Sequence, residues 1–231
     1  MSSLAGATWA GLPERPLLVV PLGSVEQHGP HLPLRTDTAI ASAAARAATE
    51  RLDGALLAPA LAYGASGEHE GFPGTISLGT EALTLLLVEY ARSACRWAGR
   101  LLVVNGHGGN LDALRTAVPA VRAEGRDVAW FPCGVPGADA HAGRAETSLM
   151  LHVEPGSVPR DRAVPGETAP IGELLPRLRA EGVRAVSPTG VLGDPAGASA
   201  EEGAQLLAGL VDRLAAAARA WRIDDAGRLQ G

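Results

Sequence analysis

The sequence lacks lysine altogether, since all 20 residues counted as Lys and Arg are arginine. Without a primary amine on any side chain, the chain cannot supply the lysine of a P-loop, a Schiff-base enzyme or a Ser-Lys hydrolase. It has only two cysteines, Cys95 and Cys133, which are isolated and form no CxxC pair. A disulfide framework is therefore excluded, and we expect two reduced thiols in a cytoplasmic protein.

Runs of basic residues and long apolar runs are also missing. The formal net charge is −5 and the arginines do not cluster, which disfavours nucleic acid as a partner. The most apolar run, residues 82–88, is far shorter than the roughly 18 residues that cross a bilayer, and the N-terminus lacks the pattern of a signal peptide. With 46% hydrophobic residues, the chain can bury a core of its own. We therefore expect one globular domain over residues 1–231 and no membrane partner.

Short apolar runs alternate with longer segments of helical periodicity. The predicted strands are 17–22, 55–60, 101–105 and 127–132, and the predicted helices are 39–52, 80–97, 110–124, 146–153 and 200–221. Thr36 or Asp37 is expected to cap the first helix and Thr80 the second, while residues 154–172 form a long surface connection. This alternation predicts an α/β three-layer sandwich with a mostly parallel sheet, which binds ligands beyond the C-terminal ends of its strands.

The loop after the first predicted strand is rich in side chains that bind metals. Glu26 and His28 are two residues apart, so in an extended segment they project to the same side. Asp37 follows at the start of the next helix, and His31 of the same loop is predicted to contact substrate. Glu, His and Asp at one strand end indicate a mixed nitrogen and oxygen metal site. The alternative is that Asp37 only caps its helix and Glu26 is solvated.

A histidine flanked by glycines follows the third predicted strand, in the sequence Asn105–Asn110. Because small neighbours surround His107, packing does not explain it, and we predict a metal ligand. A role in forming the turn is the alternative. A phosphate cradle is disfavoured, because the order is not GxGxxG and lysine is absent.

The remaining two loops add histidines and carboxylates. We expect His141 in the loop after the fourth strand and Glu146 on the first turn of the next helix to reach the same pocket. Glu68 and His69, in the loop after the second strand, are better suited to lining that pocket and binding substrate.

Five of these residues account for the charge of two divalent cations. The predicted ligands are Glu26, His28, Asp37, His107 and Glu146. Three carboxylates and one bridging hydroxide balance two doubly charged ions, and a carboxylate such as Asp37 can bridge them. Mixed carboxylate and imidazole ligands suit Zn and Fe(II), with Mn a further candidate.

These loops resemble the creatininase family of metal-dependent amidohydrolases. The resemblance lies in residues 23–38 and 105–110, with additions at 72–75 and 141–147. It implies that Glu26, His28, Asp37 and His107 bind two metals, with Asp37 bridging, and that His141 is the catalytic histidine. Creatininase has a glutamate ligand two residues after the histidine of the glycine turn, where this chain has Gly109, so we assign the fifth ligand to Glu146.

Within the family, residues 58–69, 76–82 and 189–195 are most similar to a branch of peptidases that trim a ribosomally made precursor peptide. The resemblance implies cleavage near the C-terminus of that peptide, release of a Val-Tyr-derived fragment that becomes a redox cofactor, and a homo-oligomeric enzyme. Hydrolysis of a small cyclic amide or a formamide is the alternative.

Two other readings of the motifs are weaker. A structural or storage metal site usually has four protein ligands, often with cysteine, and neither cysteine lies in the ligand loops. A Ser-His-Asp hydrolase built on Ser66 and His69 would be expected to show a GxSxG turn, and the sequence has none.

Overall fold

The computed structural model describes residues 3–230 and contains one four-stranded parallel sheet of strand order β2-β1-β3-β4. The strands are β1 (Leu17–Leu22), β2 (Ala55–Leu57), β3 (Arg100–Asn105) and β4 (Val128–Pro132). They are apolar at nearly every position because helices cover both faces of the sheet.

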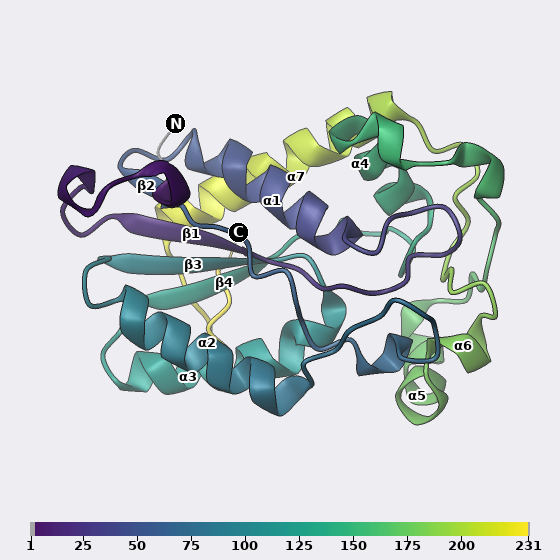
Figure 1. Cartoon of the computed structure of the whole chain (residues 1–231), viewed down its shortest axis with the longest axis horizontal. Coiled ribbons are helices and arrows are strands. Elements are labelled where there is room, and N and C mark those ends of the chain that lie inside the picture. The colour runs from purple at the N-terminus through teal and green to yellow at the C-terminus, as the bar shows by residue number, and fades with distance from the viewer. Residues whose placement is uncertain (1–2, 231) are drawn as a thin grey trace.

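Two helical layers enclose the sheet, so the predicted three-layer α/β sandwich is confirmed (Figure 1). One layer contains α1 (Thr36–Thr49), α4 (Arg144–Val153) and α7 (Ala200–Ala220), and the other contains α2 (Thr80–Ala94) and α3 (Leu111–Ala123). Successive strand residues point to opposite faces. Val19 and Leu102 therefore pack in the core beneath α1 and α7, whereas Leu18 and Val103 pack in the core beneath α2 and α3.

The predicted caps of the first two helices are wrong. Helix α1 begins at Thr36, three residues earlier than expected, and its N-cap residue is Arg35. The Thr36 hydroxyl donates to the carbonyl of Pro33 instead, and the Asp37 carboxylate points toward other polar side chains. Thr80 is the first residue of α2, and the N-cap position belongs to Gly79, whose φ of 76° favours glycine.

Two helices that were not predicted follow the segment that was expected to be a connection. Residues 154–172 contain 3₁₀ turns at Pro155–Ser157 and Arg160–Arg162 and lead into α5 (Ile171–Glu181), which is followed by α6 (Val183–Val186). Gly172 and Pro176 lie within α5 and weaken its helical signal in the sequence. Figure 1 shows α5 and α6 at one end of the molecule, outside the two layers.

The other boundaries shift by a few residues. Strand β2 ends at Leu57 rather than residue 60, and α2 ends at Ala94 rather than residue 97. Among residues 3–230, no helix is long and apolar enough to span a membrane.

Candidate active site

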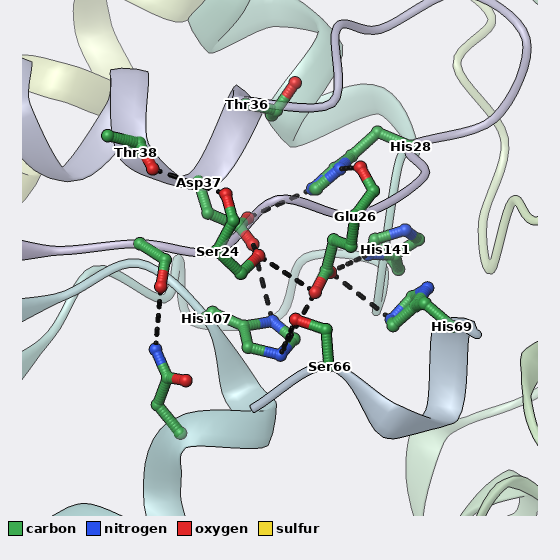
Figure 2. Close-up of polar contacts among 12 residues, drawn as sticks. Ser24, Glu26, His28, Thr36, Asp37, Thr38, Ser66, His69, His107 and His141 are labelled. Carbon is green, nitrogen blue, oxygen red and sulfur yellow. Dashed lines mark hydrogen bonds and ion pairs between the residues drawn. The ribbon is translucent and has the colours of Figure 1, made fainter. Parts of the chain in front are cut away.

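The polar residues singled out in the sequence meet beyond the C-terminal ends of the strands. Glu26 and His28 follow β1, His107 follows β3, and His141 follows β4. Asp37 and Glu146 lie on the first turns of α1 and α4, and His69 ends the 3₁₀ turn Gly67–His69. Figure 2 shows the side chains of Glu26, Asp37, His28, His69, His107 and His141 pointing toward one another.

Glu26 lies at the centre of this cluster and is 0% exposed. Its Oε2 is 3.1 Å from His107 Nε2 and accepts a hydrogen bond of 2.9 Å from the Ser24 hydroxyl. Its Oε1 is 3.3 Å from His69 Nε2 and 3.8 Å from His141 Nδ1, but has no hydrogen-bond partner. A buried carboxylate oxygen without a partner is costly, and a bound cation would satisfy it.

Asp37 lies between two of the histidines. Its Oδ1 is 3.0 Å from His28 Nε2, and its Oδ2 is 3.4 Å from His107 Nδ1 and 2.6 Å from the Ser24 hydroxyl (Figure 2). His28 Nε2 also faces Glu146 Oε2 at 4.0 Å. The single Ser24 hydroxyl is therefore placed between two carboxylates, those of Glu26 and Asp37.

Three groups of side chains each offer ligand atoms that lie within 4.8 Å of one another. The groups are Glu26, His28 and Asp37; Glu26, His69 and His141; and His28, His141 and Glu146. Carboxylate oxygens and imidazole nitrogens at such spacing, together with the unpartnered Glu26 oxygen, fit divalent transition metals. Four of the five predicted ligands belong to these groups, and the fifth, His107, adjoins them through Glu26 and Asp37. The groups also include His141 and His69, which were predicted to have other roles. Which of these residues bind metal remains a prediction.

The carboxylates set the charge of two of the imidazoles. Burial lowers the pKa of His28, but the neighbouring Asp37 outweighs it and raises that pKa to about 10. Burial likewise opposes the charged form of His107, and Glu26 raises its pKa to about 10. Burial raises the pKa of Glu26, but His107 outweighs it and holds that pKa well below its usual range. Without metal, the carboxylates favour the cationic form of both rings, whose charge offsets theirs.

His69 and His141 are neutral by contrast. Burial lowers the pKa of His69 to about 4. Burial and the cation at His28 hold the pKa of His141 well below its ordinary value. Neutral imidazoles can accept a proton or bind a metal through the unprotonated nitrogen.

Gln27 determines which nitrogen of each neutral ring carries the proton. The Gln27 Oε1 accepts a hydrogen bond of 2.9 Å from the Gly29 amide, which orients its side-chain amide. Gln27 Nε2 can then donate to His69 Nδ1 at 2.8 Å and to the Gly190 carbonyl at 3.1 Å. His141 Nε2 donates to the Gln27 backbone carbonyl at 2.8 Å. The proton of His69 is therefore on Nε2, and the lone pair of His141 is on Nδ1, which faces Glu26.

Glu146 and Glu68 are two further carboxylates with raised pKa values. Burial raises the pKa of Glu146, whose Oε2 accepts a 2.6 Å hydrogen bond from the Ala142 amide. Burial also raises the pKa of Glu68, whose Oε1 is 3.5 Å from His107 Nε2.

Position 109 has no room for a side chain, because other atoms occupy the space where its Cβ would lie. A Cβ there would overlap the Ala65 carbonyl oxygen and the His107 ring, and would lie 2.5 Å from Glu68 Oε1. The carboxylate of Glu68, from a different loop, therefore lies where a side chain at position 109 would begin.

A cavity of about 980 Å³, called the cleft below, opens beside the cluster. His69, His107, His141 and Glu68 contribute to its lining, as do residues of α5. The placement of Glu68 and His69 fits the predicted contact with substrate. His31 does not line the cleft, since it is 1% exposed and its Nε2 lies 2.9 Å from the Thr147 hydroxyl, so the geometry does not support its predicted contact.

Sequence reasoning missed Ser24 and Gln27. Ser24 precedes Glu26 by two residues, so the alternation that paired Glu26 with His28 would also have placed Ser24 on that side. Gln27 projects from the other side of the same segment and meets His69 and His141 only through the tertiary fold.

The chain was compared with known proteins. Residues 6–218 match the family described as "Creatininase: Creatinine amidohydrolase". The "Mycofactocin precursor peptide peptidase" of Mycolicibacterium smegmatis is 55% identical over 219 residues, which span 93% of this chain and 89% of the relative. The protein of the same name from Mycobacterium tuberculosis is 57% identical over 222 residues, spanning 92% and 88%. The creatinine amidohydrolase of Pseudomonas putida is 33% identical over 235 residues, spanning 88% of each chain.

Solved creatininase structures have the same fold. A structure described as "Creatininase Mn" superposes with a TM-score of 0.78 at 29% identity, covering 95% of this chain and 98% of that one. A glutamate-to-glutamine creatininase variant of the Zn-Zn type superposes with a TM-score of 0.77 at 28% identity and the same coverage.

Proposed function

The chain belongs to the creatininase family, and we propose that it is a metal-dependent peptidase that trims the mycofactocin precursor peptide. In this proposal it hydrolyses a peptide bond near the C-terminus of the modified precursor and releases the Val-Tyr-derived fragment. The similarity to the mycofactocin peptidases carries the proposal, because it reaches 55% to 57% identity over more than nine-tenths of the chain. The similarity to a creatinine amidohydrolase is 33%.

The buried cluster would hold two divalent metal ions. The proposed ligands are Glu26, His28, Asp37, His107 and Glu146, with Asp37 shared between the ions. Bound there, the two ions would lower the pKa of a water molecule and polarise the scissile carbonyl. The ligand chemistry suits Zn and Fe(II), with Mn a further candidate, and the names of the creatininase structures mention Zn and Mn.

His141 handles the proton in this proposal. Its buried ring is neutral, and its Nδ1 lone pair faces the cluster because Nε2 donates to the Gln27 carbonyl. A proton taken up at Nδ1 can be passed to the leaving nitrogen of the peptide bond. The His69 ring and the Glu68 carboxylate line the same cleft, and both help to position the substrate.

Two substitutions test these roles. Asp37→Asn should lose metal and activity together, and a variant that kept two metals and full turnover would contradict the bridging role. His141→Ala should keep both metals and lose rate, whereas loss of metal would make His141 a ligand. His152→Ala is the matched control, because that histidine is exposed on α4 and does not belong to the cluster. Elemental analysis gives the metal content, and mass spectrometry of the incubated precursor peptide gives the product.

A small cyclic amide or a formamide is the second candidate substrate, and the family relationship to creatinine amidohydrolase favours it. The cleft of about 980 Å³ lies near the upper end of the range for ligand pockets and has room for a peptide segment. Product analysis with creatinine, a formamide and the precursor peptide separates the candidates.

The proposal extends to the state of the protein in the cell. We propose a single domain over residues 1–231 that assembles as a homo-oligomer in the cytoplasm. Sedimentation analysis of the purified protein measures the assembly, and a monomeric active enzyme would contradict it.

A further inference from the structure

Helix α5 presents a stripe of three exposed side chains to the cleft. Ile171, Leu175 and Arg179 follow one another at intervals of four residues, so they lie along one side of the helix. All three line the same cavity as His69 and His107. Ile171 is 45% exposed and Leu175 is 39% exposed, although both are large and apolar. The cleft that borders the proposed metal centre thus has a partly apolar wall.

The side chains of this stripe do not hold α5 on the rest of the protein. The helix already buries Leu174 and Leu178 in a small core with Val183, Val186 and Leu192. A surface helix normally needs one apolar face, and its other face is polar. The two exposed apolar side chains on the cleft side therefore point to a ligand rather than to the fold.

The guanidinium of Arg179 is the charged group of the stripe, and it is accessible to a ligand. Arg179 is exposed and has no hydrogen bond or ion pair with any residue from 3 to 230. The other arginines of the cleft are engaged. Arg184 donates to the Gly71 carbonyl at 2.6 Å and lies 5.6 Å from the Phe72 ring centre.

Acidic side chains near the stripe are partly neutralised. Arg115 lies 3.7 Å from Asp112, and Glu181 of α5 lies 3.6 Å from Arg177, which does not line the cleft. Glu68 and Glu70 also line the cleft, and α5 contacts the Gly67–His69 turn. Arg179 is therefore the guanidinium of the cleft that a carboxylate of a ligand can reach without breaking an existing contact.

The spacing of the stripe matches an extended peptide. Four residues of α-helix rise by about 6 Å, so successive members of the stripe are separated by about that distance along the axis. In an extended chain, side chains on one side repeat every two residues, which is roughly 6.6–6.8 Å. A peptide lying along α5 can thus place side chains at alternate positions against Ile171, Leu175 and Arg179 in turn.

We propose that this stripe selects the substrate by binding the segment that precedes the scissile bond, through two apolar residues and one acidic residue at alternate positions. The inference rests on the proposed peptidase function. A bond near the C-terminus leaves only a short fragment on one side of the metal centre. In this proposal the longer N-terminal part of the peptide lies in the open cleft, along α5. Arg179 would form a charge-assisted hydrogen bond with the acidic side chain, and the apolar residues would cover Ile171 and Leu175.

The test measures binding separately from cleavage. A fluorescein-labelled peptide carries the alternating pattern upstream of Val-Tyr and ends in an amide, and a second peptide has Asn in place of its Asp. Fluorescence anisotropy gives their affinities for the full chain after chelation of metal, so that neither peptide is cleaved. Arg179→Gln should weaken binding of the acidic peptide about fivefold, which is the upper range for an exposed ion pair. Leu175→Ser should weaken it by a similar factor.

A double-mutant cycle tests whether Arg179 contacts the acidic residue of the peptide directly. The Asp-to-Asn change in the peptide should weaken binding to the original chain about fivefold, and should have no further effect on Arg179→Gln. Arg177→Gln is the control on the same helix, and it should bind both peptides as the original chain does. Equal losses for both peptides in Arg179→Gln, or equal affinities of the original chain for both, would overturn the proposal.

Two further outcomes separate the inference from the proposed function. A third peptide has the same sequence with a free terminal carboxylate. If it binds more tightly than the amide and Arg179→Gln removes the difference, Arg179 binds the C-terminus and the proposed direction of the peptide is wrong. Cleavage of the precursor by the metal-loaded chain is measured in parallel. Cleavage that ignores the pattern refutes the role of α5 and leaves the peptidase function standing. Pattern-dependent binding without cleavage refutes the peptidase function and leaves the binding surface standing.

Discussion

The Ser24 hydroxyl lies between two buried carboxylates and offers a sharp test of how the cluster is held. It is 2.9 Å from Glu26 Oε2 and 2.6 Å from Asp37 Oδ2, and its one proton can go to either. Ser24→Ala removes one oxygen and leaves the backbone unchanged. Because Ser24 is fully buried, no water can take the place of the hydroxyl without rearrangement.

The expected loss follows from the charge of the acceptors. A hydrogen bond to a charged group contributes about 1.5–3 kcal/mol, so the free energy of unfolding of the metal-free variant should fall by that amount. The same hydroxyl orients two proposed metal ligands. Loss of such a supporting contact typically weakens metal binding by roughly 10- to 100-fold, or about 1.4–2.7 kcal/mol.

Urea unfolding of chelated protein measures the first quantity, and competition with a metal chelator measures the second. Ser148→Ala is the matched control, because its buried hydroxyl donates to the Glu202 carboxylate at 2.7 Å, away from the cluster. The free energy of unfolding of Ser148→Ala should fall by a similar amount, but its metal affinity should stay unchanged. Unchanged stability and unchanged metal affinity in Ser24→Ala would refute the idea that this hydroxyl holds the two carboxylates.

The site and the core give four further predictions. Metal binding at pH 7 should release at least two protons, because His28 and His107 have a pKa of about 10 without metal and must be neutral as ligands. Glu146, with a pKa raised to about 7, and the metal-bound water would add to this number. Calorimetry in buffers of different ionisation enthalpy counts the protons. In chelated protein, the contribution of the two histidines to stability should be complete below about pH 6.5 and fall as pH rises toward 10, and a flat stability profile would contradict this. Gly109→Ala should destabilise the protein by about 1–3 kcal/mol, whereas Gly108→Ala, where a Cβ meets nothing within 4 Å, should cost much less in the same urea titration. Burial raises the pKa of the Cys133 thiol to about 12, so a thiol reagent should leave it unmodified until the protein unfolds, as peptide mass mapping would show.

Much of the site could be predicted because its residues lie in short motifs at strand ends. The apolar runs of β1 and β3 predict buried parallel strands, and parallel strands carry their following loops to one edge of the sheet. That reasoning alone brings Glu26, His28 and His107 together. Asp37 was given two roles: its expected cap of α1 is wrong, whereas its carboxylate does lie with Glu26 and His28, as the motif suggested.

Helix α5 escaped prediction for a related reason. Gly172 and Pro176 lower the intrinsic helix propensity of the segment, and its stability comes from Leu174 and Leu178 packing on residues that follow it. Local propensity does not report such contacts. The stripe that α5 presents to the cleft was therefore invisible before the tertiary fold was known.

The amino-acid sequence by itself determined the chemistry of this protein: parallel strands, carboxylates and imidazoles at their ends, and no lysine to supply positive charge. Residue type and periodicity report these properties because they are local. Only the tertiary structure decided which atoms face one another. It placed Gln27 so that His141 keeps its lone pair toward Glu26, and it buried His31 away from the cleft. It also brought Arg179 to the same cavity as His107, because the path of the chain between distant segments depends on how helices and loops pack together.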